Sequence, residues 1–287
     1  MRWSNLKFDH ADAILRALQV EIVLWNGPAP VSVLAVKADS RRVEFQLQVT
    51  DRPPVEHWSL MLGDAVHNLR SALDTCAWEM ATVDPAIVPA MPTKIYFPTA
   101  KDESDWSKRW VPSFSDIQAI YLDRMRKLQG FENLLAPENP LLDLQALDIA
   151  DKHRGLLRAD VGFETAHFRA QLRPPFGQTT FSGTLTPFRS TMVSIRQGEA
   201  IGGYTADMDF LLPAQEPQPA TVIPVIELNG KTLRLTDFTS LIAHWVRYAL
   251  DTVRYDTEEA AQRLIDAGYA TVMEEGLPRR IEMVTPL

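Results

Sequence analysis

The chain has a single cysteine among its 287 residues. Cys76 therefore has no partner for an internal disulfide bond, which fits a reducing compartment. No stretch of the sequence approaches the roughly 18 consecutive apolar residues that are needed to cross a bilayer. The first residues contain no long apolar run that ends at a small-residue cleavage site, so we expect no signal peptide. These absences predict a cytoplasmic protein that does not associate with a membrane.

The common catalytic signatures are also absent from the sequence. It contains neither a glycine-rich phosphate-binding loop nor a Gly-x-Ser-x-Gly motif. It has no His-x-x-x-His motif and no cysteine pair, so we predict neither a metal site nor a cofactor. Cys76 falls on the apolar face of a predicted helix, which indicates a core residue and not a nucleophile.

Basic residues are outnumbered in this chain. There are 29 Lys and Arg against 37 Asp and Glu, a formal net charge of −8. An acidic surface disfavours non-specific nucleic-acid binding, which depends on neutralising phosphates. A net negative charge does not exclude a local basic groove. Nucleic acid therefore remains possible as a partner, although the net charge does not favour it. The proportions of hydrophobic (46%) and charged (23%) residues are ordinary for a globular protein.

Apolar residues recur at helical spacing in five places. We predict helices near residues 12–25, 55–82, 114–129, 140–157 and 237–266. Asp9 and Asp12 are both candidate caps for the first helix, and Asn139 followed by Pro140 is typical of the start of the fourth. Residues 83–113 read as a long loop with short pieces of structure.

Other segments read as strands. Residues 31–37 are mostly apolar and residues 43–50 alternate between apolar and polar, which predicts a hairpin. Short strand-like pieces fill residues 159–235, and "LNGK" at 228–231 is a typical hairpin turn. We therefore predict an α+β fold. A helical bundle takes residues 1–158 and 237–287 with a 31–50 hairpin, and residues 159–236 are a β-rich insertion whose sheet the hairpin can join.

One polar pattern occurs twice. Residues 67–75 read "HNLRSALDT" and residues 244–252 read "HWVRYALDT", with six of nine positions identical. Positions i, i+3 and i+7 of a helix share one stripe, so His67, Arg70 and Asp74 should line up on one helix. The second stripe holds His244, Arg247 and Asp251.

Several explanations of the repeated motif remain open. Each Arg can pair with the Asp four residues along its own helix, the two helices can pack so that each Arg bridges to the other, or the repeat can arise by chance. The first stripe borders the apolar face of its helix. The second lies nearly opposite the main apolar face, so the two copies need not share one environment.

A shared polar site is the functional explanation. Such a site would bind a phosphate or carry out acid–base chemistry. The candidate ligand-binding residues are His67, Arg70, Asp74, Asp151, His153, Arg154, His244, Arg247 and Asp251. A metal is disfavoured in the first stripe because His67 and Asp74 are about 10.5 Å apart along a helix axis.

Two motifs resemble a known group of proteins. "GDAVHNLRSALD" at 63–74 and "LDIADKHR" at 147–154 resemble a family of bacterial proteins of unknown function that carry the same two helix motifs. The resemblance covers roughly residues 55–158 and implies no particular activity.

Arg-x-Ala-Leu-Asp on a bundle helix also resembles the HEPN superfamily of helical RNA-acting proteins. Its nucleases use an Arg and a His on one helix, separated by four to six residues. Here Thr75 and Thr252 stand at the first position where that His would fit. Arg52 and His57 have the spacing, but two prolines separate them. The resemblance therefore implies a HEPN-like scaffold without the HEPN catalytic pair.

Two functional hypotheses follow. The first is a non-catalytic bacterial cytosolic protein that binds a partner or a small anionic ligand at a polar helix interface. The alternative is a HEPN-like enzyme acting on RNA or nucleotides, which predicts that His67, His153 and His244 converge in an open cleft. Whether the chain is an enzyme stays open, and a homo-oligomer is compatible with either hypothesis.

Overall fold

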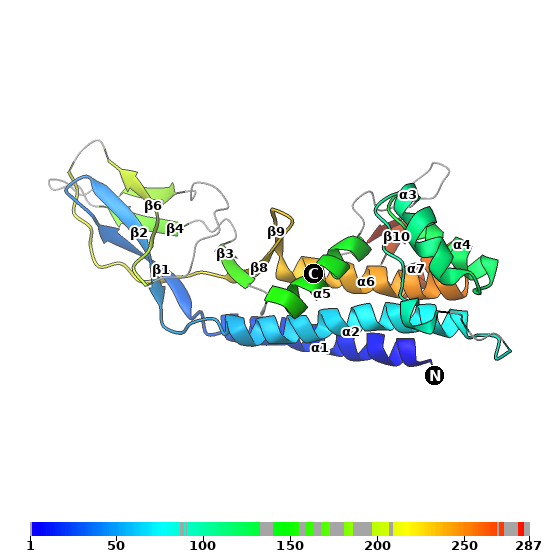
Figure 1. The fold of residues 1–287 in the computed structure, drawn as a ribbon. Coiled ribbons are helices and arrows are strands. Elements are labelled where there is room, and N and C mark those ends of the chain that lie inside the picture. The colour runs from blue at the N-terminus through cyan, green and yellow to red at the C-terminus, as the bar shows by residue number, and fades with distance from the viewer. Residues whose placement is uncertain are drawn as a thin grey trace. The chain divides into compact units, whose positions relative to one another are not determined.

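The computed structural model describes residues 2–86, 89, 91–132, 140–154, 159–163, 168–172, 181–185, 197–206, 209–268, 270–272 and 281–283. The chain divides into two compact units (Figure 1). The first comprises Met1–Leu18, Ser59–Leu157 and Thr236–Leu287, and the second comprises Gln19–Trp58 and Arg158–Leu235. Helices dominate the first unit and antiparallel strands the second, so the predicted α+β fold is confirmed.

The longest helices contribute most of the first unit. The helices of the chain are α1 (Trp3–Asn26), α2 (Val55–Ala81), α3 (Glu103–Asp105), α4 (Ala119–Lys127), α5 (Pro140–Arg154), α6 (Leu235–Arg254) and α7 (Thr257–Asp266). Short turns of 3₁₀ and π-helix occupy Pro92–Lys94, Trp106–Trp110 and Val111–Phe114, in the segment that the sequence predicts to be a loop with short structured pieces, and the last of them ends one residue beyond it. The small pair β10 (Ala270–Val272) and β11 (Ile281–Met283) also belongs to this unit.

Buried polar contacts join α1, α2 and α6. The backbone N–H of Ser4 donates to Glu79 Oε1 at 3.1 Å, and the Ser4 hydroxyl donates to Glu79 Oε2 at 2.6 Å. Arg254 of α6 donates to the same hydroxyl and lies 3.8 Å from Glu79. Ser4 is fully buried, so these contacts fix the register of three helices away from water.

The first helix begins nine residues before its predicted start. Phe8 and Ala11 are buried and continue the apolar stripe of Leu15 and Leu18 toward the N-terminus, which extends the helix to Trp3. The predicted capping roles of Asp9 and Asp12 are therefore both wrong, since both residues follow the start of the helix. Asp12 lies inside the helix and forms a 2.6 Å ion pair with Arg16, four residues along.

The predicted last helix, 237–266, is two helices. Asp256 stands between α6 and α7, and its carboxylate accepts the Glu259 N–H at 2.8 Å as the N-cap of α7. Arg124 caps the end of α6 by donating to the carbonyls of Val253, Arg254 and Tyr255. The sequence "DTEE" at 256–259 is a capping signature that the pattern of apolar residues alone conceals. The predicted helix at 114–129 is also shorter in the structure, since α4 spans Ala119–Lys127.

The second unit contains the antiparallel strands β1 to β9. One sheet has the order β6-β2-β1-β7, and another the order β3-β8-β9, while β4 pairs with β5. The strand bounds are β1 (Val31–Lys37), β2 (Arg42–Val49), β3 (Ala159–Phe163), β4 (Phe168–Leu172), β5 (Phe181–Leu185), β6 (Ala200–Thr205), β7 (Gln218–Pro219), β8 (Val222–Leu228) and β9 (Lys231–Arg234). The predicted hairpin is β1–β2, and it pairs with strands from the 159–235 region as expected.

Alternation along the hairpin builds the core of the second unit. Val33 pairs with Leu47 and Ala35 with Phe45, and these four side chains are buried. The "LNGK" segment forms the β8–β9 turn, where Asn229 and Gly230 have φ values of 53° and 75°. Both lie in the left-handed region that a type I′ turn requires, which explains why asparagine and glycine occupy these positions.

Candidate functional site

The first copy of the repeated motif holds an extended segment, residues 95–100, against α2. Arg70 Nη2 donates to the Phe97 carbonyl at 2.8 Å and lies 2.8 Å from Asp74 Oδ1. The same carboxylate oxygen accepts the Phe97 N–H at 2.9 Å. Arg70 is 8% exposed and Phe97 is fully buried. We call these three residues the Arg70 clip, because together they fasten one backbone position to the helix.

Burial sets the protonation behaviour of the clip. Desolvation raises the pKa of the Asp74 carboxyl above its usual range, while the Arg70 guanidinium and the Phe97 N–H pull it back down. The charged form of the Asp74 carboxylate, which is largely buried, therefore depends on its contacts with Arg70 and the Phe97 N–H. Removing either partner leaves a costly buried group.

Gln129 completes the attachment of the same segment. Its Nε2 donates to the carbonyls of Pro98 at 3.1 Å and Met125 at 2.8 Å, and its Oε1 accepts the Ala100 N–H at 2.8 Å. The Gln129 side chain is fully buried. Arg70 Nη2, Asp74 Oδ1 and Gln129 are therefore all engaged with the backbone of this segment, while Arg70 Nη1 is buried without a hydrogen-bond partner among the described residues.

His67 lies at the edge of this region. Its Nδ1 is 3.3 Å from Asp148 Oδ1 of α5, and its side chain is largely exposed. The contact links α2 to α5 and is an ion pair when the histidine is protonated.

The second copy of the motif has the same internal pair in a different setting. Arg247 Nε lies 3.0 Å from Asp251 Oδ2, so of the explanations left open by the sequence, pairing of each Arg with the Asp four residues along its own helix occurs in both copies. Asp251 is only 2% exposed, and its other oxygen lies 3.9 Å from Arg254 Nη1. The Arg247 guanidinium lies 5.7 Å from the centre of the Phe8 ring, a cation–π distance.

The sequence places this second stripe nearly opposite the main apolar face of its helix. In the structure that side is covered as well, because His244 and Asp251 are both buried. The opposite side of α6 is covered by α1 and by α7, which turns back after Asp256. A single long helix could not provide that cover.

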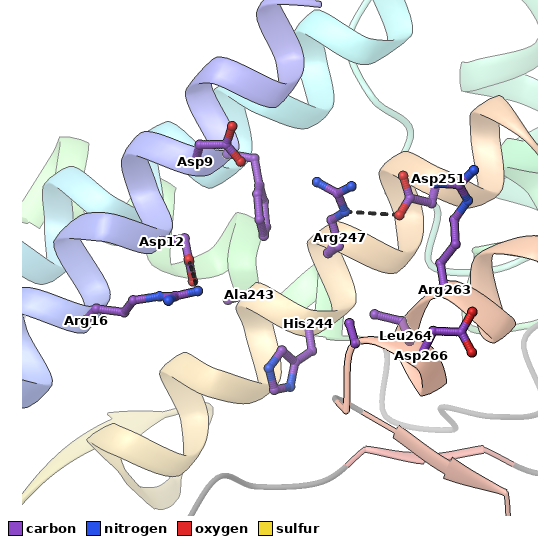
Figure 2. Close-up of a pocket in the computed structure, with 12 residues that line it drawn as sticks. Asp9, Asp12, Arg16, Ala243, His244, Arg247, Asp251, Arg263, Leu264 and Asp266 are labelled. Atoms are coloured by element: carbon purple, nitrogen blue, oxygen red, sulfur yellow. Dashed lines mark hydrogen bonds and ion pairs between the residues drawn. The ribbon is translucent and has the colours of Figure 1, made fainter. Parts of the chain in front are cut away.

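A cavity of about 480 Å³ lies between α1, α6 and α7 (Figure 2). It is lined by Phe8, Asp9, Asp12 and Arg16 of α1, Ala243, His244, Arg247 and Asp251 of α6, and Arg263, Leu264, Asp266 and Ala267 at the end of α7. All three lining segments belong to the first unit. We call this the α1–α6–α7 cavity.

Arg247 presents hydrogen-bond donors to the cavity. Its Nε is taken by Asp251, and its two terminal nitrogens point away from that carboxylate toward α1 (Figure 2). No described residue forms a hydrogen bond with these terminal nitrogens. A guanidinium held by Nε with both Nη groups open has the geometry for bidentate binding of a carboxylate or phosphate.

The other two arginines of the cavity have local partners. Arg16 pairs with Asp12 at 2.6 Å, and Arg263 pairs with Glu259 at 2.8 Å. Asp9 and Asp266 add two more exposed carboxylates to the lining. The cavity therefore mixes both signs of charge, and Arg247 is distinguished by terminal nitrogens that no described residue binds.

His244 contributes a neutral ring to the cavity wall. Burial lowers its pKa below the usual value of 6.5, and the charge of Asp12 only partly offsets this effect. The imidazole is therefore uncharged at neutral pH. A neutral imidazole has one donor and one acceptor nitrogen, so it can hydrogen-bond a ligand without adding positive charge.

The structure divides the residues that the sequence groups together. His244, Arg247 and Asp251 line the α1–α6–α7 cavity, whereas His67, Arg70 and Asp74 do not. Neither arginine bridges to the helix of the other copy among the described residues. Asp151, His153 and Arg154 occupy the last turn of α5, and their side chains lie outside the part of the chain that the structure describes.

Sequence reasoning missed the lining residues contributed by α1 and α7. Arg263 and Asp266 lie within the predicted last helix, where nothing in the pattern signals that the chain turns back toward Arg247. Phe8 and Asp9 precede the predicted first helix. The Asp12–Arg16 spacing was the one available signal, since it is typical of an ion pair on a helix surface.

Comparison with known proteins gives no match: no family model, no curated protein and no solved structure matches this chain. The two motif resemblances stay predictions. Within the described part of the chain, no helix combines the length and apolar character needed to span a membrane. No three His, Cys, Asp or Glu side chains among the described residues gather as a metal site would require.

Proposed function

We propose that this chain is a non-catalytic, cytosolic binding protein whose α1–α6–α7 cavity takes a small anion at Arg247. The anion is a carboxylate or a phosphate group carried on a small molecule. The observation that carries the proposal is the Arg247 guanidinium, anchored through Nε by buried Asp251 with its terminal nitrogens open to the cavity.

The anchoring of Arg247 supports a binding role. Asp251 is buried and lies between Arg247 and Arg254, so it is held in place from both sides. An arginine fixed in this way loses little conformational entropy when it binds, because its orientation is already set. The Phe8 ring beneath the guanidinium fixes it further.

The size and charge of the cavity favour a small ligand over a polymer. A volume of about 480 Å³ falls within the range of small-molecule sites. The carboxylates of Asp9, Asp12 and Asp266 line the same cavity. They would repel the continuous phosphates of RNA, while a ligand with one anionic group can engage Arg247 alone.

Binding of defined probes tests the proposal. Isothermal titration of the purified chain with inorganic phosphate, succinate and citrate should detect at least one ligand. Arg247→Gln should weaken that ligand roughly 10- to 100-fold, the effect of losing a charged bidentate contact. Arg41→Gln is the matched control, because Arg41 pairs with Asp209 on the surface of the second unit.

Two results would contradict the proposal. One is an affinity for every detected anion that Arg247→Gln leaves unchanged. The other is cleavage of RNA by the purified chain that Arg247→Gln abolishes, with no anion bound, which would favour the HEPN-like alternative instead.

A further inference from the structure

The outer face of α1 carries a regular row of exposed residues. Their spacing alternates between three and four along the helix, and we call the row the α1 stripe: Trp3, Leu6, His10, Ala13, Ala17, Val20 and Leu24. All seven are exposed, with Trp3 at 71%, Val20 at 56% and Leu24 at 69%. An average spacing of 3.5 residues is the pattern of a helix that packs lengthwise against another helix.

The stripe is not part of the protein's own core. The buried positions of α1 include Phe8, Ala11, Leu15, Leu18 and Ile22. At 100° per residue, the centre of the α1 stripe lies about 150° around the helix from these positions. A helix on the surface of a globular protein normally turns polar residues outward, so a row on the far side that is apolar except for His10 points to a partner.

We infer that the α1 stripe is a dimerisation surface, on which α1 of a second copy of this chain packs antiparallel. The small side chains of Ala13 and Ala17 at the middle allow the two helix axes to approach closely. The larger Trp3, Val20 and Leu24 cover the ends. The helix has 24 residues, which gives a contact of about 36 Å, or just over three heptads.

The charged residues beside the α1 stripe favour a second copy of the chain as the partner and an antiparallel direction for its α1 helix. Lys7 and Glu21 flank it on one side, and Asp9 and Arg16 on the other. In an antiparallel pair, residues on the same flank meet. Lys7 then approaches Glu21 of the second copy, and Asp9 approaches Arg16 of the second copy. The two-fold axis repeats both attractions, so the surface is complementary to itself.

A parallel pair fits less well. It would bring Arg2 of one helix against Lys7 of the other, two like charges, while only Arg16 and Glu21 would attract. Lys7, Glu21 and Arg16 also have partners within the chain, Ser71, His57 and Asp12 in that order. These contacts are partly exposed and do not prevent a shared or alternative pairing across the dimer.

A membrane surface is a poorer partner for this face. Helices that lie on anionic membranes carry lysine and arginine beside their apolar face. Around the α1 stripe, basic Arg2, Lys7 and Arg16 are matched in number by acidic Asp9, Asp12 and Glu21, so no basic excess borders the stripe, and the whole chain carries a net charge of −8.

Sedimentation equilibrium of the full chain over a range of concentrations tests the inference. The wild-type chain should form a dimer, and Ala13→Glu should weaken it at least about a hundredfold by placing two carboxylates at the centre of the contact. Ala13 is exposed, so the substitution should leave the helical circular dichroism unchanged. Ala38→Glu, an exposed Ala→Glu change in the β1–β2 turn, is the matched control and should not alter dimerisation.

A charge exchange tests the antiparallel direction. Lys7→Glu should weaken the dimer by roughly tenfold, and adding Glu21→Lys to the same chain should restore it, because the attraction is rebuilt with the signs reversed. A chain that stays monomeric up to about 1 mM would overturn the inference. A dimer that Ala13→Glu leaves intact, or vesicle binding by a monomer, would overturn it equally.

Discussion

Replacing Arg70 with alanine is the sharpest test of how the first motif is used. The side chain is 8% exposed and supplies a 2.8 Å hydrogen bond to the Phe97 carbonyl and a 2.8 Å ion pair to Asp74. A hydrogen bond to a charged group contributes about 1.5–3 kcal/mol, and its loss leaves a buried carbonyl without that donor. The Asp74 side chain is 26% exposed, so water compensates it in part. We expect Arg70→Ala to lower the free energy of unfolding by about 3 kcal/mol.

Urea unfolding followed by circular dichroism measures this loss. Arg247→Ala provides the comparison: its side chain is 32% exposed and buried Asp251 keeps a second cation, Arg254 Nη1, at 3.9 Å, so we expect a smaller loss of about 2 kcal/mol. The two arginines share no partner, so the double variant should lose the sum of the two effects within about 0.5 kcal/mol. A loss below about 1 kcal/mol for Arg70→Ala, or a coupling energy above 1 kcal/mol, would refute this account of the clip.

Three further outcomes follow from buried groups. Gln129→Ala should lower the free energy of unfolding by about 3 kcal/mol, because three backbone groups lose their partner, whereas exposed Gln118→Ala should have little effect on chemical denaturation. Burial raises the pKa of the Cys76 thiol to about 12, so at pH 8 a thiol reagent should modify the native chain about a thousandfold more slowly than the urea-unfolded chain; equal rates would contradict the burial. Burial lowers the pKa of His244 in the folded state, so the unfolded chain takes up the proton first and stability falls as the pH drops below about 6.5. His244→Gln should reduce that loss between about pH 7 and 5 in a thermal denaturation series, and an unchanged pH profile would contradict the prediction.

Local pattern predicts much of this fold. The hairpin of β1 and β2, the turn at 228–231 and helix α2 follow from alternation, turn chemistry and helical periodicity within short windows. The errors fall at helix ends. Asp12 looks like a cap because aspartate is common there, yet the burial of Phe8 carries the helix past it. Residues 237–266 read as one helix because the periodicity of α6 and α7 is similar on both sides of Asp256.

The candidate site was harder to predict than the fold. His244, Arg247 and Asp251 stand out because the motif repeats, but nothing in the sequence shows that α1 and α7 enclose them. A cavity between segments more than 200 residues apart in the chain depends on tertiary packing, which local windows do not contain. The repeat itself also misleads, because it suggests that Arg70 and Arg247 belong to one site.

The two copies of the motif differ in which nitrogen of the arginine meets the aspartate. Arg70 reaches both Asp74 and the Phe97 carbonyl through Nη2, and its Nη1 is buried without a hydrogen-bond partner among the described residues, so the outer end of its guanidinium is enclosed within the fold. Arg247 donates to Asp251 through Nε. This contact orients the guanidinium and leaves its two terminal nitrogens on the cavity side. The same i,i+4 pair can therefore fasten a structure or prepare a binding group, depending on this one contact. On this reasoning Arg70 variants should lose stability and retain anion binding after allowance for unfolding, and Arg247 variants should retain most of their stability and lose the anion.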